Sequence, residues 1–194
     1  MILITVPHAG PGEGRDDGAV LFLPLLEEKL ESMGEEFHVI IGDNARSILD
    51  LNRTAAASSE FAEEFFQMLK QTSVHIDLHS FPELDEETEF GYDLGIWSQH
   101  QFVLFSIPEV TDESLLKALL NQFEESGVKT LVQGAGFENY LTNAASVLFD
   151  TPSVLIEVND GDGLNYEMMA AALAEGIVDF LAGPEMLDSV QSPV

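Results

Sequence analysis

Cysteine is absent from this 194-residue sequence, and basic residues are rare, with four Lys and three Arg against 35 Asp and Glu. Without thiols the chain can form no disulfide, no redox cysteine centre and no thiolate site for a metal ion. So few cations disfavour nucleic acid and anionic membrane surfaces as partners, because phosphate binding depends on clustered Lys and Arg. Any metal ion must be held by His, Asp and Glu, which suits zinc and its neighbours.

Long hydrophobic runs are also missing. No apolar stretch approaches the roughly 20 residues that a membrane helix needs, and the amino terminus lacks the basic region of a signal peptide. We therefore expect a soluble, cytoplasmic protein. The hydrophobic content of 45% is ordinary for a globular chain, so the formal net charge of −28 predicts a solvated, self-repelling surface rather than disorder.

Short β-type runs alternate with longer helix-type segments along the chain. This alternation predicts an α/β fold with three layers, α/β/α, around a mostly parallel, mixed central sheet. We expect residues 1–184 to form one domain and residues 185–194 to be a frayed tail. The predicted strands are residues 2–6, 37–41, 74–78, 92–97, 102–107, 128–132 and 154–158, and the predicted helices are residues 19–33, 58–71, 113–126 and 164–181.

Polar residues stand at the ends of three predicted strands, where ligands of such sheets bind. His8 follows the first strand, and Glu157 lies inside an apolar strand near the carboxyl end. His75, Asp77 and His79 alternate along the third strand, so their side chains share one face. Because an unpaired buried charge costs several kcal/mol, Glu157 calls for a metal ion or an arginine as its partner.

A fourth segment, residues 43–53, contains Arg46 and Arg53, two of the three arginines. Guanidinium groups bind carboxylates through two parallel hydrogen bonds and can stabilise an oxyanion. This favours an anionic substrate near both arginines. The alternative is that they only pair with some of the many acidic residues.

Together and in this order, the four segments resemble the N-formylglutamate amidohydrolase family and, more distantly, the zinc carboxypeptidases. The resemblance implies a fold like that of the zinc-dependent exopeptidases and of the phosphorylase/hydrolase-like proteins. It also implies a zinc-dependent amidohydrolase that cleaves an N-acyl amino acid, similar to N-formylglutamate, with a zinc-activated water. The matching segments are Pro7-His8-Ala9-Gly10, Arg46 with Asp50-Leu51-Asn52-Arg53, Asp77-Leu78-His79-Ser80 and Glu157-Val158-Asn159.

The resemblance also implies a metal site with one Zn²⁺ ion per chain, or another divalent ion in its place. His8 and His79 match two of its ligands. The third ligand is a carboxylate from the loop after His8. Glu13 is the expected residue, and Asp16 and Asp17 are the alternatives.

The same resemblance implies the catalytic and substrate-binding roles. Glu157 matches the general base that takes a proton from the water, and Arg46 faces the scissile carbonyl oxygen. Asn52, Arg53 and Asn159 are the expected substrate-binding residues. The implied substrate is a small carboxylate-bearing N-acyl amino acid or a short peptide.

Two carboxylates are expected to support the metal ligands. Asp50 would accept the second ring N–H of His8, and Asp77 would anchor a neighbouring group by hydrogen bonds. His75 is expected to be structural, with contact to metal or substrate as the alternative. Two other functions remain open: a zinc metallopeptidase of carboxypeptidase or cell-wall peptide type, and an inactive small-molecule binding protein of the same fold. The sequence predicts no oligomeric state.

Overall fold

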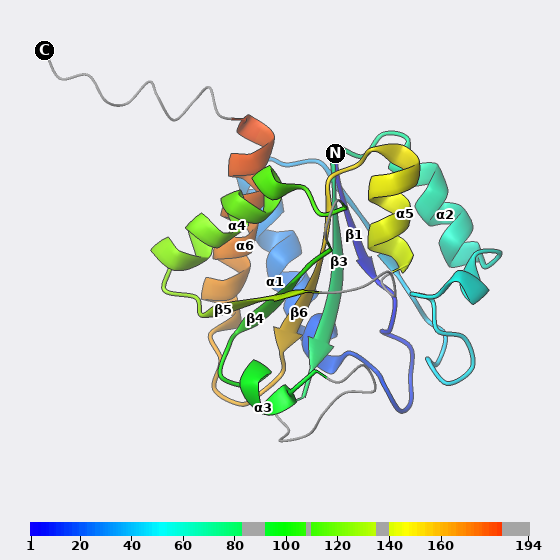
Figure 1. Cartoon of the computed structure of the whole chain (residues 1–194), viewed down its shortest axis with the longest axis horizontal. Coiled ribbons are helices and arrows are strands. Elements are labelled where there is room, and N and C mark those ends of the chain that lie inside the picture. The colour runs from blue at the N-terminus through cyan, green and yellow to red at the C-terminus, as the bar shows by residue number, and fades with distance from the viewer. Residues whose placement is uncertain (83–91, 108–109, 135–139, 184–194) are drawn as a thin grey trace, which may run out of the picture.

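One six-stranded sheet with the order β2-β1-β3-β6-β4-β5 runs through the centre of the computed structural model (Figure 1). All neighbouring strands are parallel except β6 and β4, which are antiparallel, so the predicted mostly parallel, mixed sheet is confirmed. The structure describes residues 1–82, 92–107, 110–134 and 140–183, and the predicted tail at 185–194 lies outside these ranges. The strands are β1 (Ile2–Val6), β2 (Phe37–Ile41), β3 (Val74–Phe81), β4 (Phe102–Ser106), β5 (Thr130–Gly134) and β6 (Ser153–Asn159).

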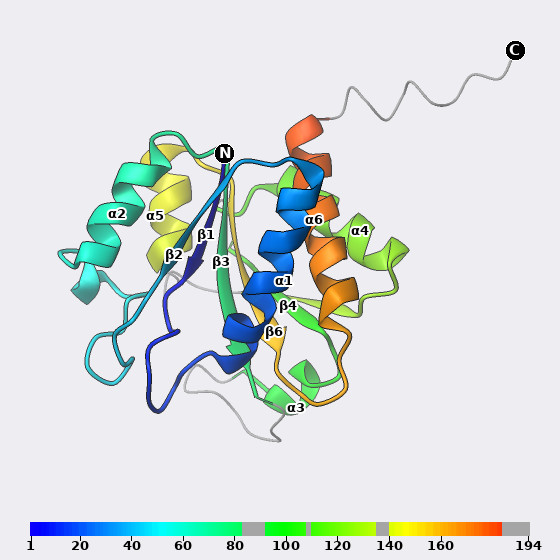
Figure 2. The ribbon, with the colours of Figure 1, turned by 180° about the vertical axis from the view of Figure 1, so that it is seen from behind.

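Helices cover both faces of the sheet and complete the predicted α/β/α layers (Figure 2). On one face lie α1 (Asp17–Met33), α4 (Glu113–Glu125) and α6 (Tyr166–Ala182), and on the other lie α2 (Glu60–Leu69) and α5 (Tyr140–Phe149). The short helix α3 (Leu94–Trp97) lies near the amino end of β4, and a 3₁₀ helix, η1, spans Thr54–Ala56. Among the described helices, none is both long enough and apolar enough to cross a bilayer.

Side chains of β3 divide between the two helical layers in strict alternation. Val74, Ile76 and Leu78 belong to the core beneath α1 and α6. His75 turns to the other layer, where its ring lies edge-on to Phe65 of α2 at a centroid distance of 5.1 Å. Because successive strand residues point to opposite faces, Asp77 and His79 also face the α2 and α5 layer.

Local chemistry explains the ends of two predicted helices. Gly34 closes α1 with φ of 78°, a left-handed conformation that glycine adopts without strain. The Asp112 side chain accepts hydrogen bonds from the backbone N–H groups of Ser114 and Leu115 and so begins α4.

Two elements differ from the prediction. Residues 92–97, predicted as a strand, contain the helix α3, which begins where the Asp93 side chain accepts from the Ile96 N–H. Such a short apolar run can be buried in either conformation, and the cap decides between them. The helix α5 was not predicted, because its outer face carries Val147 and Leu148, 65% and 67% exposed, while its buried face carries Leu141 beside Thr142, Ala144 and Ala145.

The carboxyl ends of β1, β3 and β6 meet at one edge of the sheet. Thr5 of β1 is in register with Asp77 of β3, and His79 of β3 is in register with Glu157 of β6. Pairing therefore brings residues that are about 70 to 150 positions apart in the sequence to one face and one edge.

Candidate metal centre

Three buried side chains converge at this edge of the sheet. His8 follows β1, Asp16 precedes α1, and His79 lies in β3; one ligand atom from each lies within 4.8 Å of the others. The Oδ2 atom of Asp16 is 2.9 Å from Nδ1 of His79 and 3.3 Å from Nδ1 of His8. These three side chains could hold one metal ion, and we call His8, Asp16 and His79 the metal cluster.

The acidic member of the metal cluster is Asp16 and not Glu13, the residue expected first from the sequence. The loop after His8 folds back so that the backbone N–H of Asp16 donates to the carbonyl oxygen of His8, at 3.0 Å. Glu13 is exposed in that loop. Asp17, the other alternative, is exposed and lies 2.9 Å from Arg15. The backbone contact brings Asp16, and not Glu13, next to the two histidines. The spacing of the acidic residues in the sequence does not reveal this contact.

The donor set of the metal cluster fits a divalent cation. Nδ1 of His8 is buried and has no hydrogen-bond partner among the described residues. A buried polar atom without a partner is costly, and coordination would satisfy it. Two imidazole nitrogens and one carboxylate oxygen are typical zinc ligands, and in a tetrahedral site such atoms lie about 3.3 Å apart. The observed separations of 2.9 Å and 3.3 Å from Asp16 are close to this value.

The outer nitrogen of His8 contacts Asp50. Nε2 of His8 lies 2.8 Å from Oδ1 of Asp50, and Arg46 and Arg53 lie 3.4 Å and 3.7 Å from the other carboxylate oxygen. Burial raises the pKa of Asp50, but the hydrogen bond from His8 and the charges of His8, Arg53 and Arg46 outweigh it and hold this pKa well below its usual range. Asp50 therefore remains an acceptor for the His8 ring.

The outer nitrogen of His79 lies between an acceptor and a donor. Nε2 is 3.4 Å from Oδ1 of Asp77 and 3.0 Å from Nδ2 of Asn52. Asp77 is fully buried, which raises its pKa, yet the neighbouring charge and hydrogen bond of His79 bring the pKa below its usual value. Burial lowers the pKa of His79, and the charge of Asp77 and the hydrogen bond to Asp16 raise it well above its ordinary value.

Glu157 is half-buried beside the metal cluster. It faces His79 across the β3–β6 pair. Burial raises the pKa of Glu157 to about 7; the nearby charge of Asp16 adds to the rise, while His79, His8 and Arg46 oppose it. A carboxyl group with a pKa near neutrality can both accept and return a proton, as general acid–base catalysis requires.

The four residues expected to contact substrate divide into two pairs. Arg46 and Arg53 remain partly accessible, with 33% and 28% of their side chains exposed. Asn52 is 1% and Asn159 is 3% exposed. The Asn159 amide donates to the carbonyl oxygens of Ser98 and His100, at 3.3 Å and 2.8 Å, and its oxygen accepts from Gly161 at 2.8 Å.

Both asparagine amides are thus committed to internal hydrogen bonds. Asn52 donates to Asp77 and accepts from the backbone N–H of Leu141, at 3.1 Å and 3.0 Å. The Asn52 amide lies behind the metal cluster, where its Nδ2 contacts Nε2 of His79. The sequence patterns did not point to Thr5, whose hydroxyl donates a hydrogen bond to Asp77 at 2.7 Å. Pairing of β1 with β3 was the signal that could have found it.

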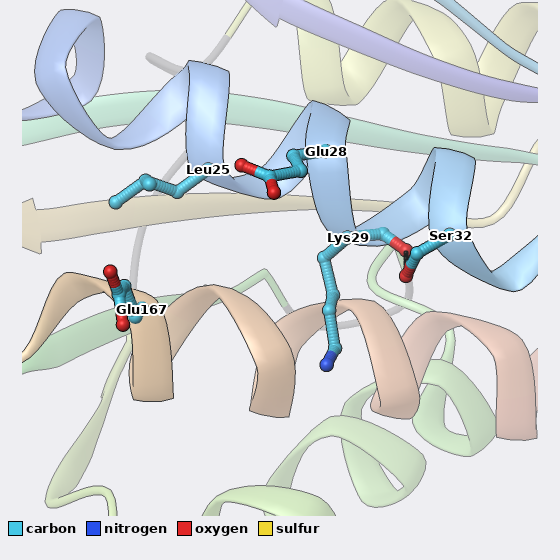
Figure 3. Close-up of a pocket in the computed structure, with 5 residues that line it drawn as sticks. All are labelled: Leu25, Glu28, Lys29, Ser32 and Glu167. Carbon is cyan, nitrogen blue, oxygen red and sulfur yellow. Dashed lines mark hydrogen bonds between the residues drawn. The ribbon is translucent and has the colours of Figure 1, made fainter.

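A separate surface cavity of about 330 Å³ lies between α1 and α6 (Figure 3). Residues of the metal cluster do not line it. It therefore adds nothing to the site described above. Its lining residues are Leu25, Glu28, Lys29, Ser32 and Glu167.

No protein-family model and no curated protein matches the chain. Solved structures do match. A metallo-carboxypeptidase from Burkholderia cenocepacia superposes with a TM-score of 0.64 at 13% identity over 93% of this chain, which spans only 56% of the carboxypeptidase chain. The N-acetylmuramyl-L-alanine amidase Ami1 from Mycobacterium smegmatis gives a TM-score of 0.58 at 13% identity, over 93% of this chain and 96% of the amidase. An N-formylglutamate amidohydrolase from Ralstonia eutropha JMP134 gives a TM-score of 0.54 at 12% identity, over 91% of this chain and 92% of the amidohydrolase. At such identities the similarity shows a shared fold.

Proposed function

We propose that this protein is a zinc-dependent hydrolase that cleaves the amide bond of a small N-acyl amino acid, as in N-formylglutamate. One observation carries the proposal: a buried His8–Asp16–His79 cluster lies beside the half-buried carboxyl group of Glu157, and Nδ1 of His8 has no hydrogen-bond partner among the described residues. The names of the three similar structures support it, because an amidase, a carboxypeptidase and an amidohydrolase all hydrolyse amide bonds.

In this proposal Nδ1 of His8, Nδ1 of His79 and a carboxylate oxygen of Asp16 hold the cation. When bound, a divalent cation polarises a carbonyl group and makes water a stronger nucleophile at neutral pH. Asp50 accepts the outer N–H of His8 and fixes its ring, and Asp77 does the same for His79. These two carboxylates leave both Nδ1 atoms free for coordination.

Glu157 acts as the general base. Its carboxylate accepts a proton from the attacking water and returns it to the amide nitrogen as the C–N bond breaks. A pKa of about 7 suits both transfers, since the group is ionised in a large fraction of molecules yet still basic. A pure binding site would gain nothing from such a buried base, which argues against the inactive binding protein.

Arg46 and Arg53 bind the substrate carboxylate or stabilise the oxyanion. They are two of the seven basic residues of the chain, and both lie within 4 Å of Asp50, itself a partner of His8. A local cationic patch next to a dication would offset the long-range repulsion between an anionic substrate and a chain of net charge −28.

A metallopeptidase remains the second candidate. The same accessible arginines could bind the terminal carboxylate of a peptide, and the carboxypeptidase and the N-acetylmuramyl-L-alanine amidase share the fold. Substrate length separates the two candidates, because a site for a single acylated amino acid excludes longer chains.

The test uses full-length protein stripped with a chelator and reloaded with Zn²⁺, Co²⁺ or Mn²⁺. N-formylglutamate, other N-acyl amino acids, short peptides and a muramyl peptide serve as substrates. We expect one tightly bound ion per chain and metal-dependent release of a free amino acid. Preference for peptides would support the second candidate. Stoichiometric ligand binding without turnover in the zinc-loaded protein, or failure to bind metal, would contradict the proposal.

The substitution Glu157→Gln separates the base from the metal site. We expect kcat to fall by about 10² to 10⁴-fold while zinc binding is retained. Glu167→Gln on α6, an exposed residue, is the matched control and should leave kcat unchanged.

A further inference from the structure

A buried chain of hydrogen bonds leads from the metal cluster into the sheet. The Thr5 hydroxyl lies 2.7 Å from Oδ1 of Asp77 and 2.9 Å from Nε2 of His75. Nδ1 of His75 lies 2.7 Å from the hydroxyl of Ser153. These four residues, Thr5, His75, Asp77 and Ser153, are 0% exposed, and the proposed reaction uses none of them directly.

The number of available protons fixes which group donates in each of these hydrogen bonds. A carboxylate can only accept, so the single proton of Thr5 points to Asp77. The Thr5 oxygen must then accept from His75, whose Nε2 carries the ring proton. Burial lowers the pKa of His75 to about 4, so the ring is neutral and its Nδ1 accepts from Ser153. Every proton along the chain thus points toward Asp77.

Asp77 competes with Asn52 for the outer nitrogen of His79. The Asn52 oxygen accepts from the Leu141 N–H, which fixes the amide and points Nδ2 at both Asp77 and His79. If Nε2 of His79 accepts from Asn52, the ring proton resides on Nδ1, and Nδ1 cannot ligate a cation. If Nε2 donates to Asp77, Nδ1 is available.

We propose that Thr5 is a positioning residue for the metal centre. With His75 and Ser153 behind it, the Thr5 hydroxyl holds the Asp77 carboxylate where it accepts a hydrogen bond from the Nε2–H of His79. Nδ1 of His79 is then left for the cation. This inference rests on the proposed function, since it presupposes a metal ion held by His8, Asp16 and His79.

The test compares Zn²⁺ affinity and the protonation of the His79 ring in three variants. Thr5→Val keeps the shape of the side chain and removes the hydroxyl, whereas Thr5→Ser keeps the hydroxyl. Thr151→Val is the matched control, because Thr151 is also a buried threonine, 3% exposed, but lies outside the chain of hydrogen bonds. Titration against a competing chelator gives the dissociation constant, and imidazole ¹⁵N NMR shows which ring nitrogen carries the proton.

We expect Thr5→Val to weaken Zn²⁺ binding about 10- to 100-fold, as loss of support behind a ligand typically does. Thr5→Ser and Thr151→Val should keep the wild-type affinity. In the zinc-loaded wild type we expect the His79 ring proton on Nε2, because Nδ1 would hold the cation. Should Thr5→Val fail to fold, Ser153→Ala replaces it, with a smaller loss in the same direction.

Failure of the proposed function and failure of the role of Thr5 give different results. A wild-type protein that does not bind Zn²⁺ overturns the proposed function. A wild-type protein that binds Zn²⁺, with unchanged affinity in Thr5→Val and Ser153→Ala, overturns the role of Thr5 and leaves the proposed function standing. A proton found on Nδ1 of His79 in the zinc-loaded protein overturns His79 as a metal ligand, and with it the metal site of the proposed function.

Discussion

At the scale of single residues, each histidine of the metal cluster divides its two ring nitrogens between two tasks. Nδ1 of His8 and Nδ1 of His79 face Asp16, and the Nε2 atoms face Asp50 and Asp77. A carboxylate behind an imidazole orients the ring and raises its basicity. In the proposed metal site, the supporting carboxylates would therefore contribute to metal affinity without touching the ion.

Asp50→Asn tests this division at His8. The amide oxygen is a weaker acceptor than the carboxylate, so we expect Zn²⁺ affinity to fall about 10- to 100-fold. Calorimetric titration of the stripped protein measures the change. Glu64→Gln is the control, because Glu64 pairs with His38 at the same distance of 2.8 Å on an exposed surface. Equal affinity in the Asp50→Asn variant and the wild type would contradict the role of Asp50.

His75 makes the stability of the fold depend on pH. Burial lowers its pKa to about 4, from an unfolded value of about 6.5. As the pH falls between these values, the unfolded chain takes up a proton that the folded chain does not, so stability is lost toward acid. The wild type should lose about 2 kcal/mol more than His75→Gln between about pH 7.5 and about pH 5.

Denaturant unfolding of both proteins at the two pH values gives this difference. Comparing them cancels other titrating groups, including Glu157, whose raised pKa acts with the opposite sign. His38→Gln, at an exposed histidine, is the control. A difference between wild type and His75→Gln that stays constant with pH would show that His75 is not the source.

At the scale of elements, the regular strands could be predicted and the loops could not. Alternation on β3 was enough to place His75, Asp77 and His79 on one face, because the period of a strand is fixed locally. The choice of Asp16 over Glu13 depends on how the loop between β1 and α1 packs against residues 43–46. Such long-range contacts leave no local pattern.

The loop between β1 and α1 depends on Gly10 for its path. A Cβ atom at Gly10 would lie 2.2 Å from the carbonyl oxygen of Asn44, so Gly10→Ala must displace the loop that carries Asp16. We expect a loss of about 1–3 kcal/mol in the free energy of unfolding, together with weaker metal binding. Thermal melts and metal titration measure the two effects.

Gly134→Ala is the control for this substitution, because a Cβ atom at Gly134 would meet nothing within 4 Å. It should keep both stability and metal affinity. Wild-type metal affinity in Gly10→Ala would show that Asp16 does not depend on the path of this loop.

At the scale of the whole molecule, a strong negative charge surrounds a small site that contains two of the few basic residues. The chain carries a net charge of −28, yet two of its three arginines lie beside Asp50, the partner of His8. The excess acid destabilises the folded state by self-repulsion. Arg46 and Arg53 offset that charge only locally.

Salt should therefore stabilise this protein. Raising NaCl from about 0.05 M to about 1 M shortens the screening length to roughly 3 Å, which weakens repulsion between surface carboxylates more than contacts between buried groups. We expect Tm of the metal-free protein to rise across this range, with KCl matching NaCl because the effect depends on ionic strength. Differential scanning calorimetry measures it. A Tm that stays constant or falls with salt would show that self-repulsion among the 35 acids does not limit stability.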